Sequence, residues 1–319
     1  MANSRWQIAD GGWQMVVHVR ARRPTPPYPL LSYLWLHEPD AETIARAVNE
    51  LGLPPADPAE LASAYADVFL LNVPPYGTVF TDPAGEINGA EAQRVMALFE
   101  AHGYCPPELD SVGAPDHVGL CLGFLDERGL EIGELSLDWV AVCCLAVERE
   151  PSAHPFYRTL ASQTRAALLS HPQTIVPKPS SSIFNLQSPI AAYPDEEVSL
   201  RDLIRFFLAP ARCGVFLSRS RLGQFAKQWG LRLPFGSRFE VAEMLFASAG
   251  EAGQVESLID SLEAEIGEWR SAYRQWGETH PGWRPSLEVW LERTETACHV
   301  LTRMREIALD FGSPDAQPT

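Results

Sequence analysis

Asp116 and His117 are adjacent in the stretch GAPDHVGLCLGFL, where a carboxylate and an imidazole could exchange a proton, bind a metal ion or simply begin a helix. A catalytic or metal site also needs a nucleophile or further ligands at a suitable spacing. Asp116 follows Pro115 and precedes an apolar run, which is the position of a helix N-cap. The residues alone leave two alternatives open: a cap, or a cap that also contacts a ligand.

The rest of the sequence lacks the motifs of several enzyme classes. Its only two lysines, Lys178 and Lys227, do not follow a glycine, which excludes a phosphate-binding loop that ends in Gly-Lys. No GxGxxG follows a strand, no GxSxG or HExxH is present, and the eight histidines show no zinc spacing. We therefore expect no catalytic residue, no cofactor and no metal ion, and an acid–base enzyme built on Asp116 and His117 is the less favoured hypothesis.

Composition limits the class of protein further. The chain of 319 residues is 46% hydrophobic and 21% charged, and it has no apolar run of 18 residues, so we expect no membrane-spanning helix. No secretory signal is recognisable at the N-terminus, which predicts a cytoplasmic protein. The net charge of −16 argues against nucleic acid as a partner and favours basic partners. The six cysteines form no CxxC pair and are expected to be free thiols.

Helix signals dominate the first half of the chain. In DPAELASAYADVFLL, Asp57 is the expected N-cap, Pro58 the first helical residue and Glu60 its capping-box partner. The stretch NGAEAQRVMALFEAHG repeats this scheme with Asn88 and Glu91. Only WQMVVHV, residues 13–19, alternates as a strand would. The pattern predicts an all-α fold.

The second half contains further helices after a change in composition. Residues 171–197 are rich in Pro and Ser and are predicted to form a linker. Ser237 and Glu240 form another capping box, and apolar residues at spacings of four and three predict a long helix over 251–277, followed by one over 286–310. We therefore predict a helical bundle over 1–190 and a smaller helical unit over 191–319.

Three stretches of the chain resemble one known family. YADVFLLNVPPYGTVFTDPAG (65–85), APDHVGLCLGFL (114–125) and HPFYRTLASQTRAAL (154–168) are similar, in order and spacing, to motifs of the TorD/DmsD (NarJ-like) redox-enzyme chaperones. The resemblance covers about 30–170, roughly half of the chain, and the stretch FLAPARCGVFLSR resembles an extension of some longer members.

The resemblance implies an all-α, cytoplasmic chaperone that is not an enzyme. Members of the family bind the precursor of a molybdopterin-dependent oxidoreductase of the DMSO-reductase superfamily, often through its twin-arginine signal peptide. They hold the apo-enzyme for insertion of its cofactor and delay its export. A second hypothesis is a helical scaffold that binds a folded oxidoreductase subunit, and a homodimer is possible in either case.

A receptor for such a peptide needs carboxylates for the arginines and an apolar groove for the run that follows. Asp116 and His117 are the candidates for the polar end, and Pro75 would stiffen the loop that presents Tyr76. The candidates for the groove walls are aromatic: Tyr65, Phe69, Tyr76 and Phe80. Of these, Tyr65 and Phe69 lie on a helical stripe and are equally suited to the core. The chain departs from the family at Cys121 and Gly77, where acidic residues are usual, so negative charge is lost near the candidate site.

Overall fold

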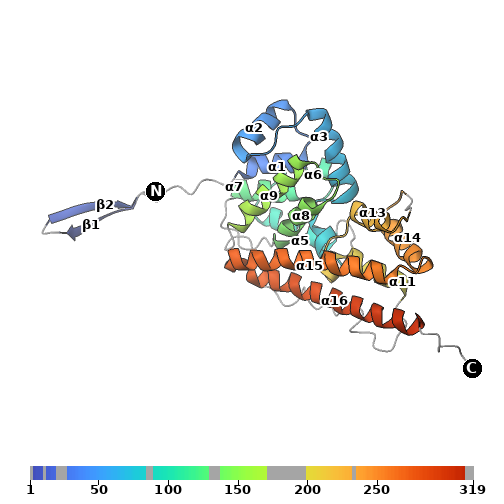
Figure 1. Ribbon diagram of the computed structural model, residues 1–319. Coiled ribbons are helices and arrows are strands. Elements are labelled where there is room, and N and C mark those ends of the chain that lie inside the picture. The colour runs from blue at the N-terminus through green and yellow to red at the C-terminus, as the bar shows by residue number, and fades with distance from the viewer. Residues whose placement is uncertain are drawn as a thin grey trace, which may run out of the picture.

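We describe a computed structural model over residues 3–9, 12–18, 27–83, 89–128, 137–170, 199–231 and 235–312. The predicted all-α class is confirmed for the body of the molecule, which consists of packed helices (Figure 1). The predicted linker, residues 171–197, lies outside the described residues. Within those residues, no helix combines the length and apolar character that crossing a bilayer requires.

Helices in the first half run in this order: α1 (Tyr28–Leu36), α2 (Ala41–Leu51), α3 (Pro58–Tyr65), the π-helix η1 (Ala66–Asn72), α4 (Gly77–Thr81), α5 (Ala90–Ala101), α6 (Leu109–Val112), α7 (Val118–Arg128), α8 (Asp138–Arg149) and α9 (Pro155–Leu169). Helices in the second half follow: α11 (Leu200–Leu208), α12 (Pro210–Cys213), α13 (Arg219–Gln228), α14 (Arg238–Glu251), α15 (Val255–Thr279), the short 3-10 helix η2 (Pro281–Trp283) and α16 (Arg284–Gly312).

Two of the three predicted N-caps begin helices as expected, one of them as a complete capping box. The carboxylate of Asp57 accepts hydrogen bonds from the N–H groups of Ala59 and Glu60, and Ser237 and Glu240 make both bonds of a complete box. Helix α5 instead begins with Gly89 as its N-cap, without a side-chain bond, and Asn88 lies outside the described residues. Helices α1 and α2 were not recognised in the sequence.

The helix predicted after Asp57 changes its hydrogen-bonding pattern halfway. Residues 66–72 form the π-helix η1, which ends when the N–H of Val73 donates to the carbonyl oxygen of Val68 at 2.7 Å. The side-chain amide of Asn72 donates back to the carbonyl oxygen of Asp67 at 2.9 Å. π-Helices are rare and are frequently found at functional sites. This one leaves Leu70 and Leu71 exposed.

The two predicted helical units share one hydrophobic core. Phe80 of α4 packs against Phe216, with ring centroids 5.3 Å apart. Helices α15 and α16 lie side by side below the first half of the chain (Figure 1), and Trp290 of α16 donates to the carboxylate of Asp138 at 3.1 Å. The boundary proposed near residue 190 stays a prediction, but the units it separates are packed together.

A buried carboxylate joins the same two units through charge. The carboxylate of Glu265 on α15 accepts from Arg149 at 2.9 Å and from the indole N–H of Trp269 at 2.9 Å, and it lies 3.4 Å from the guanidinium of Arg221. Arg221 also donates to the carbonyl oxygen of Arg149 at 3.1 Å. We call these four residues the Glu265 network. Because Glu265 is only 5% exposed, its two arginines supply the charge that burial requires.

An antiparallel hairpin of β1 (Asn3–Ala9) and β2 (Gly12–His18) precedes the helices. It includes most of the one stretch whose alternation suggested a strand. Figure 1 shows the hairpin beside the helical body.

Candidate functional site

The loop before α4 and the segment before α7 are joined by backbone hydrogen bonds. The N–H of Gly77 donates to the carbonyl oxygen of Asp116, and the N–H of Val118 donates to that of Pro75, each at 2.9 Å. Tyr76 and His117 thereby form an isolated antiparallel bridge. We call residues 75–78 together with 116–118 the Asp116 junction. It brings four of the seven predicted site residues together: Pro75, Tyr76, Asp116 and His117.

Asp116 caps a different helix from the one expected. One oxygen of its carboxylate, Oδ2, accepts the backbone N–H of Thr78 at 2.7 Å and also the hydroxyl of Thr78. Thr78 lies in the first turn of α4, so the negative charge sits at the positive end of that short helix. The predicted cap of its own helix, α7, is therefore wrong. The reason is a contact between residues 38 positions apart, which local sequence cannot reveal.

His117 occupies the position expected of Asp116 at the start of α7. Its Nδ1 accepts the backbone N–H of Gly119 at 3.1 Å, which fixes the ring as an acceptor at that nitrogen. Burial lowers the pKa of His117 to about 3, because water no longer solvates the charged imidazolium. His117 is therefore neutral at physiological pH and is not a source of positive charge in the junction.

Tyr76 links the junction to the surface. Its hydroxyl donates to the carbonyl oxygen of Val112 at 3.0 Å, and its ring meets that of His117 edge-on at 5.0 Å. Burial, and then the negative charge of Asp116, raise the pKa of Tyr76, so the hydroxyl remains a donor. Since Val112 ends α6, this bond holds α6 in place over the junction.

The other three predicted residues lie away from the junction. Tyr65 and Phe69 pack with Trp35 and Tyr157 in an aromatic cluster, where Phe69 is 2% exposed. Phe80 is completely buried against Phe216. In this conformation, Phe69 and Phe80 are core residues, and neither forms the wall of a surface groove.

The two departures from the family pattern have a structural explanation. A Cβ at Gly77 would lie 2.8 Å from Cγ of Glu91 and 2.9 Å from the ring of Trp139, so no larger residue fits there. Glu91, which accepts from Trp139 at 3.0 Å and pairs with Arg94, supplies a carboxylate at this place from α5. Burial, followed by the charges of Asp116 and Glu91, raises the pKa of Cys121 well above its usual value. A neutral residue at 121 thus avoids a third acidic group in the same space.

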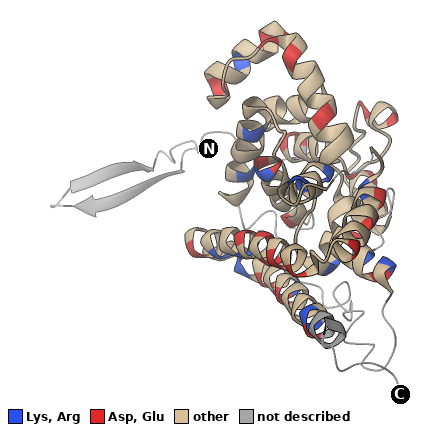
Figure 2. Ribbon diagram, turned by 45° about the vertical axis from the view of Figure 1, so that its right-hand side comes forward, with Lys and Arg blue, Asp and Glu red and all other residues tan. Residues whose placement is uncertain are grey.

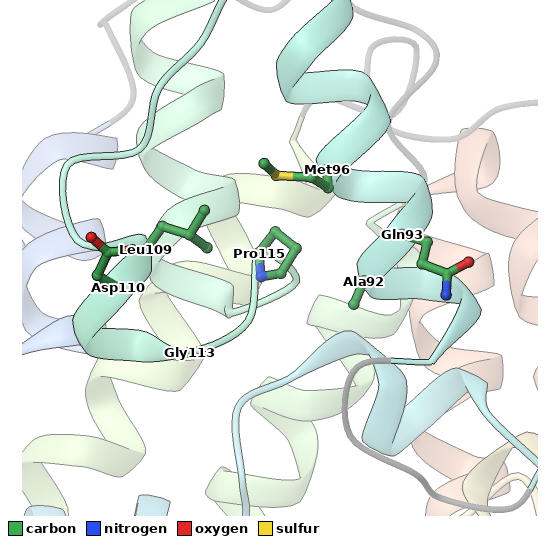
Figure 3. A pocket seen from close by; sticks show the side chains of 7 residues that line it. All are labelled: Ala92, Gln93, Met96, Leu109, Asp110, Gly113 and Pro115. Carbon is green, nitrogen blue, oxygen red and sulfur yellow. The ribbon is translucent and has the colours of Figure 1, made fainter.

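A surface groove runs above the junction between α5 and the segment that contains α6. It consists of two adjoining hollows of about 500 and 390 Å³ that share Met96, Leu109 and Asp110. Figure 3 shows Met96, Leu109 and Pro115 approaching one another in its centre, with Gln93 and Asp110 on opposite sides. Glu100 lines the second hollow. Sequence patterns did not identify this groove, because its residues come from a helix and from a loop that only folding brings together.

The groove has an apolar centre and an acidic border, a combination suited to an apolar segment that also carries basic residues. Pro115, which lines the groove, directly precedes Asp116, so the junction fixes one border from below. No group of three or more His, Cys, Asp or Glu residues is placed to hold a metal ion in the part of the chain that the structure describes.

Residues 36–141 match the model of a protein family described as nitrate reductase delta subunit. The match covers about a third of the chain and supports its resemblance to the NarJ- and TorD-like chaperones for the maturation of molybdoenzymes. No curated protein and no solved structure matches the chain significantly. The matched segment contains the Asp116 junction and the whole groove.

Proposed function

We propose that the protein is a chaperone that binds the precursor of a molybdopterin-dependent oxidoreductase of the DMSO-reductase superfamily in the cytoplasm. It acts by binding, without catalysis, and holds the catalytic subunit for cofactor insertion. The observation that carries this proposal is the position of the groove: an exposed apolar groove with acidic residues lies entirely within the segment that matches the family model.

The proposed ligand is the client's twin-arginine signal peptide. Its apolar run fits against Met96, Leu109 and Pro115, and its arginines face Asp110 and Glu100. The net charge of −16 favours the approach of a basic peptide (Figure 2). In this proposal, the residues predicted from the sequence support the groove and do not line it. Tyr76, Asp116 and His117 hold the loop under the groove. The other four support the helices that form it: Tyr65, Phe69, Pro75 and Phe80.

Calorimetric titration with a twin-arginine signal peptide tests the binding mode. We expect Glu100→Gln/Asp110→Asn to weaken binding roughly tenfold, because both exposed carboxylates lose their charge. The matched control is Glu288→Gln/Glu292→Gln on α16, which removes the same charge from exposed positions elsewhere. Equal losses in both variants would mean that only net charge matters, and the groove would not be the site.

A helical scaffold that binds a folded subunit is the second candidate function. It is favoured by three exposed apolar side chains: Leu70, Leu71 and Phe235. Leu70 and Leu71 lie on η1, which the bonds from Ser220 to Asn72 join to α13. Arg219 of α13 in turn packs on the ring of Phe235. If this function is correct, Leu70→Ser/Phe235→Ser abolishes co-purification of the folded catalytic subunit but leaves binding of the signal peptide unchanged. The homodimer stays a prediction, which sedimentation equilibrium would test.

A further inference from the structure

The two hollows of the groove differ in charge. The second hollow is lined by two carboxylates, Glu100 and Asp110, whereas the first has only Asp110, at the border that the two share. The rest of the first hollow is lined by apolar residues, by a glycine and by the uncharged Gln93. Among the described residues that line the groove, none is Lys, Arg or His. A cation is therefore attracted to the second hollow, and an apolar side chain is better placed in the first.

The order of residues along α5 gives this difference a direction. Ala92, Met96 and Glu100 follow one another at spacings of four, which places them on one face of the helix. From Ala92 to Glu100 the helix advances by about 12 Å, from the first hollow to the second. Figure 3 shows Ala92, Gln93 and Met96 in this order along α5. The groove thus becomes more acidic toward the C-terminus of α5.

Backbone groups add to the negative character of the second hollow. A helix carries a partial negative charge at its C-terminus, and α5 ends at Ala101, directly after Glu100, which lines this hollow. Pro106 and Pro107, which also line it, have no backbone N–H that could repel a cation. Both effects favour a guanidinium group at this end of the groove.

We propose that the signal peptide lies antiparallel to α5, with its arginines in the second hollow and its apolar run in the first. Because the arginines of such a peptide precede its apolar run, the peptide enters the groove beside Glu100 and leaves it beside Ala92 and Pro115. The arrangement rests on the proposed function, since it has the same ligand in the same groove. It also fixes where the rest of the client extends from the groove: next to the Asp116 junction, because Pro115 directly precedes Asp116.

Cys105 allows the direction of the peptide to be measured on the natural chain. Its thiol is exposed and lines the second hollow, whereas four of the other five cysteines are buried and Cys298 is half-buried. Two signal peptides of one sequence would carry a bromoacetyl group, either before the arginines or after the apolar run. We expect the first peptide to alkylate Cys105 at least about tenfold faster, because binding holds its reactive group beside the thiol. Mass spectrometry identifies the modified cysteine, and Cys298 on α16 is the internal control that both peptides should modify at the same slow rate.

The outcomes separate the direction of the peptide from its binding. Where calorimetry shows that both peptides bind, faster alkylation of Cys105 by the second peptide, or equal rates for the two, would overturn the antiparallel arrangement and leave the proposed function intact. Absence of binding by both peptides would overturn the proposed function, and the arrangement with it.

A carboxylate placed at the other end of the groove gives a second test. Gln93→Glu adds a negative charge to the first hollow, at an exposed position of α5. We expect it to strengthen up to about fivefold the binding of a signal peptide with a lysine added after its apolar run, but not that of the unaltered peptide. The matched control, Gln275→Glu, adds the same charge at an exposed position of α15 and should show no such preference. An equal gain for both peptides in the Gln93 variant, or the same preference in the control, would contradict the proposed direction.

Discussion

The Asp116 junction and the Glu265 network both bury a carboxylate, but they hold it with different partners. Glu265 lies between two arginines and an indole N–H, and it joins the two halves of the chain. Asp116 is bound by one backbone N–H and one hydroxyl, both of Thr78, and its Oδ1 has no hydrogen-bond partner among the described residues. In the Glu265 network, oppositely charged groups from distant parts of the sequence neutralise one another. In the Asp116 junction, the carboxylate fixes a loop beneath the groove.

This difference means that the two regions should respond differently to substitution. Removing Glu265 leaves the partly buried guanidinium of Arg221 without its anion and Arg149 with only the exposed Glu268, so its effect should appear in global stability. Changes in the Asp116 junction should be smaller in free energy and should displace the loop that supports the groove. The following predictions test that distinction.

The largest effect is expected for Glu265→Ala. Arg149 and Arg221 lose their shared carboxylate, and we expect the free energy of unfolding to fall by roughly 3 kcal/mol. Urea denaturation followed by circular dichroism measures the change. A loss below about 1 kcal/mol would show that the network contributes no more than a surface ion pair.

Gly77→Ala tests how tightly the junction is packed. Because the new Cβ meets Glu91 and Trp139 below 3 Å, we expect a loss of about 2 kcal/mol from overpacking. Gly223→Ala in α13 is the matched control, since nothing lies within 4 Å of its Cβ and alanine favours a helix. The control should be neutral or stabilising, and equal losses in both variants would contradict the packing argument.

The neutral state of His117 predicts a dependence of stability on pH. Its pKa in the folded protein, about 3, lies below the unfolded value near 6.5, so the unfolded state takes up the proton first as the pH falls. Stability should therefore be complete above pH 6.5 and decline toward pH 3, with about 2 kcal/mol lost at pH 5. His117→Asn, whose side-chain oxygen can replace Nδ1 as acceptor, should lose this part of the slope. Unfolding measured across pH in both proteins gives the comparison.

Asp116→Asn should have the smallest effect. The amide oxygen can still accept from Thr78, so we expect only about 1 kcal/mol from the loss of charge. Hydrogen exchange of the amide of Thr78 should nevertheless become faster, because the bond is weaker. Unchanged protection at Thr78, with the same loss of stability, would show that Asp116 does not hold the loop.

Local sequence patterns predicted the helices better than the contacts between them. The caps at Asp57 and Ser237 depend on neighbours three residues away, and the stripe from Ile259 to Trp276 repeats along one helix, so both were visible in the sequence. The change to a π-helix at Ala66 was not visible, because the same apolar stripe fits both helix types.

The candidate site was predicted only in part. Asp116, His117 and Tyr76 do meet, but the partner of Asp116 is Thr78, and the lack of space at Gly77 comes from Glu91 and Trp139. Such contacts depend on how distant helices approach one another. The groove was missed for the same reason.

The bond between Thr78 and Asp116 also has a consequence for how this protein can diversify. It closes a loop of the chain whose interior contains α5, α6 and every residue that lines the groove. Both ends of that loop are anchored in the core, and so are its buried residues such as Phe80, Val95 and Phe99. Substitutions at the exposed positions that line the groove can therefore alter the preferred ligand while these anchors and the surrounding helices stay the same.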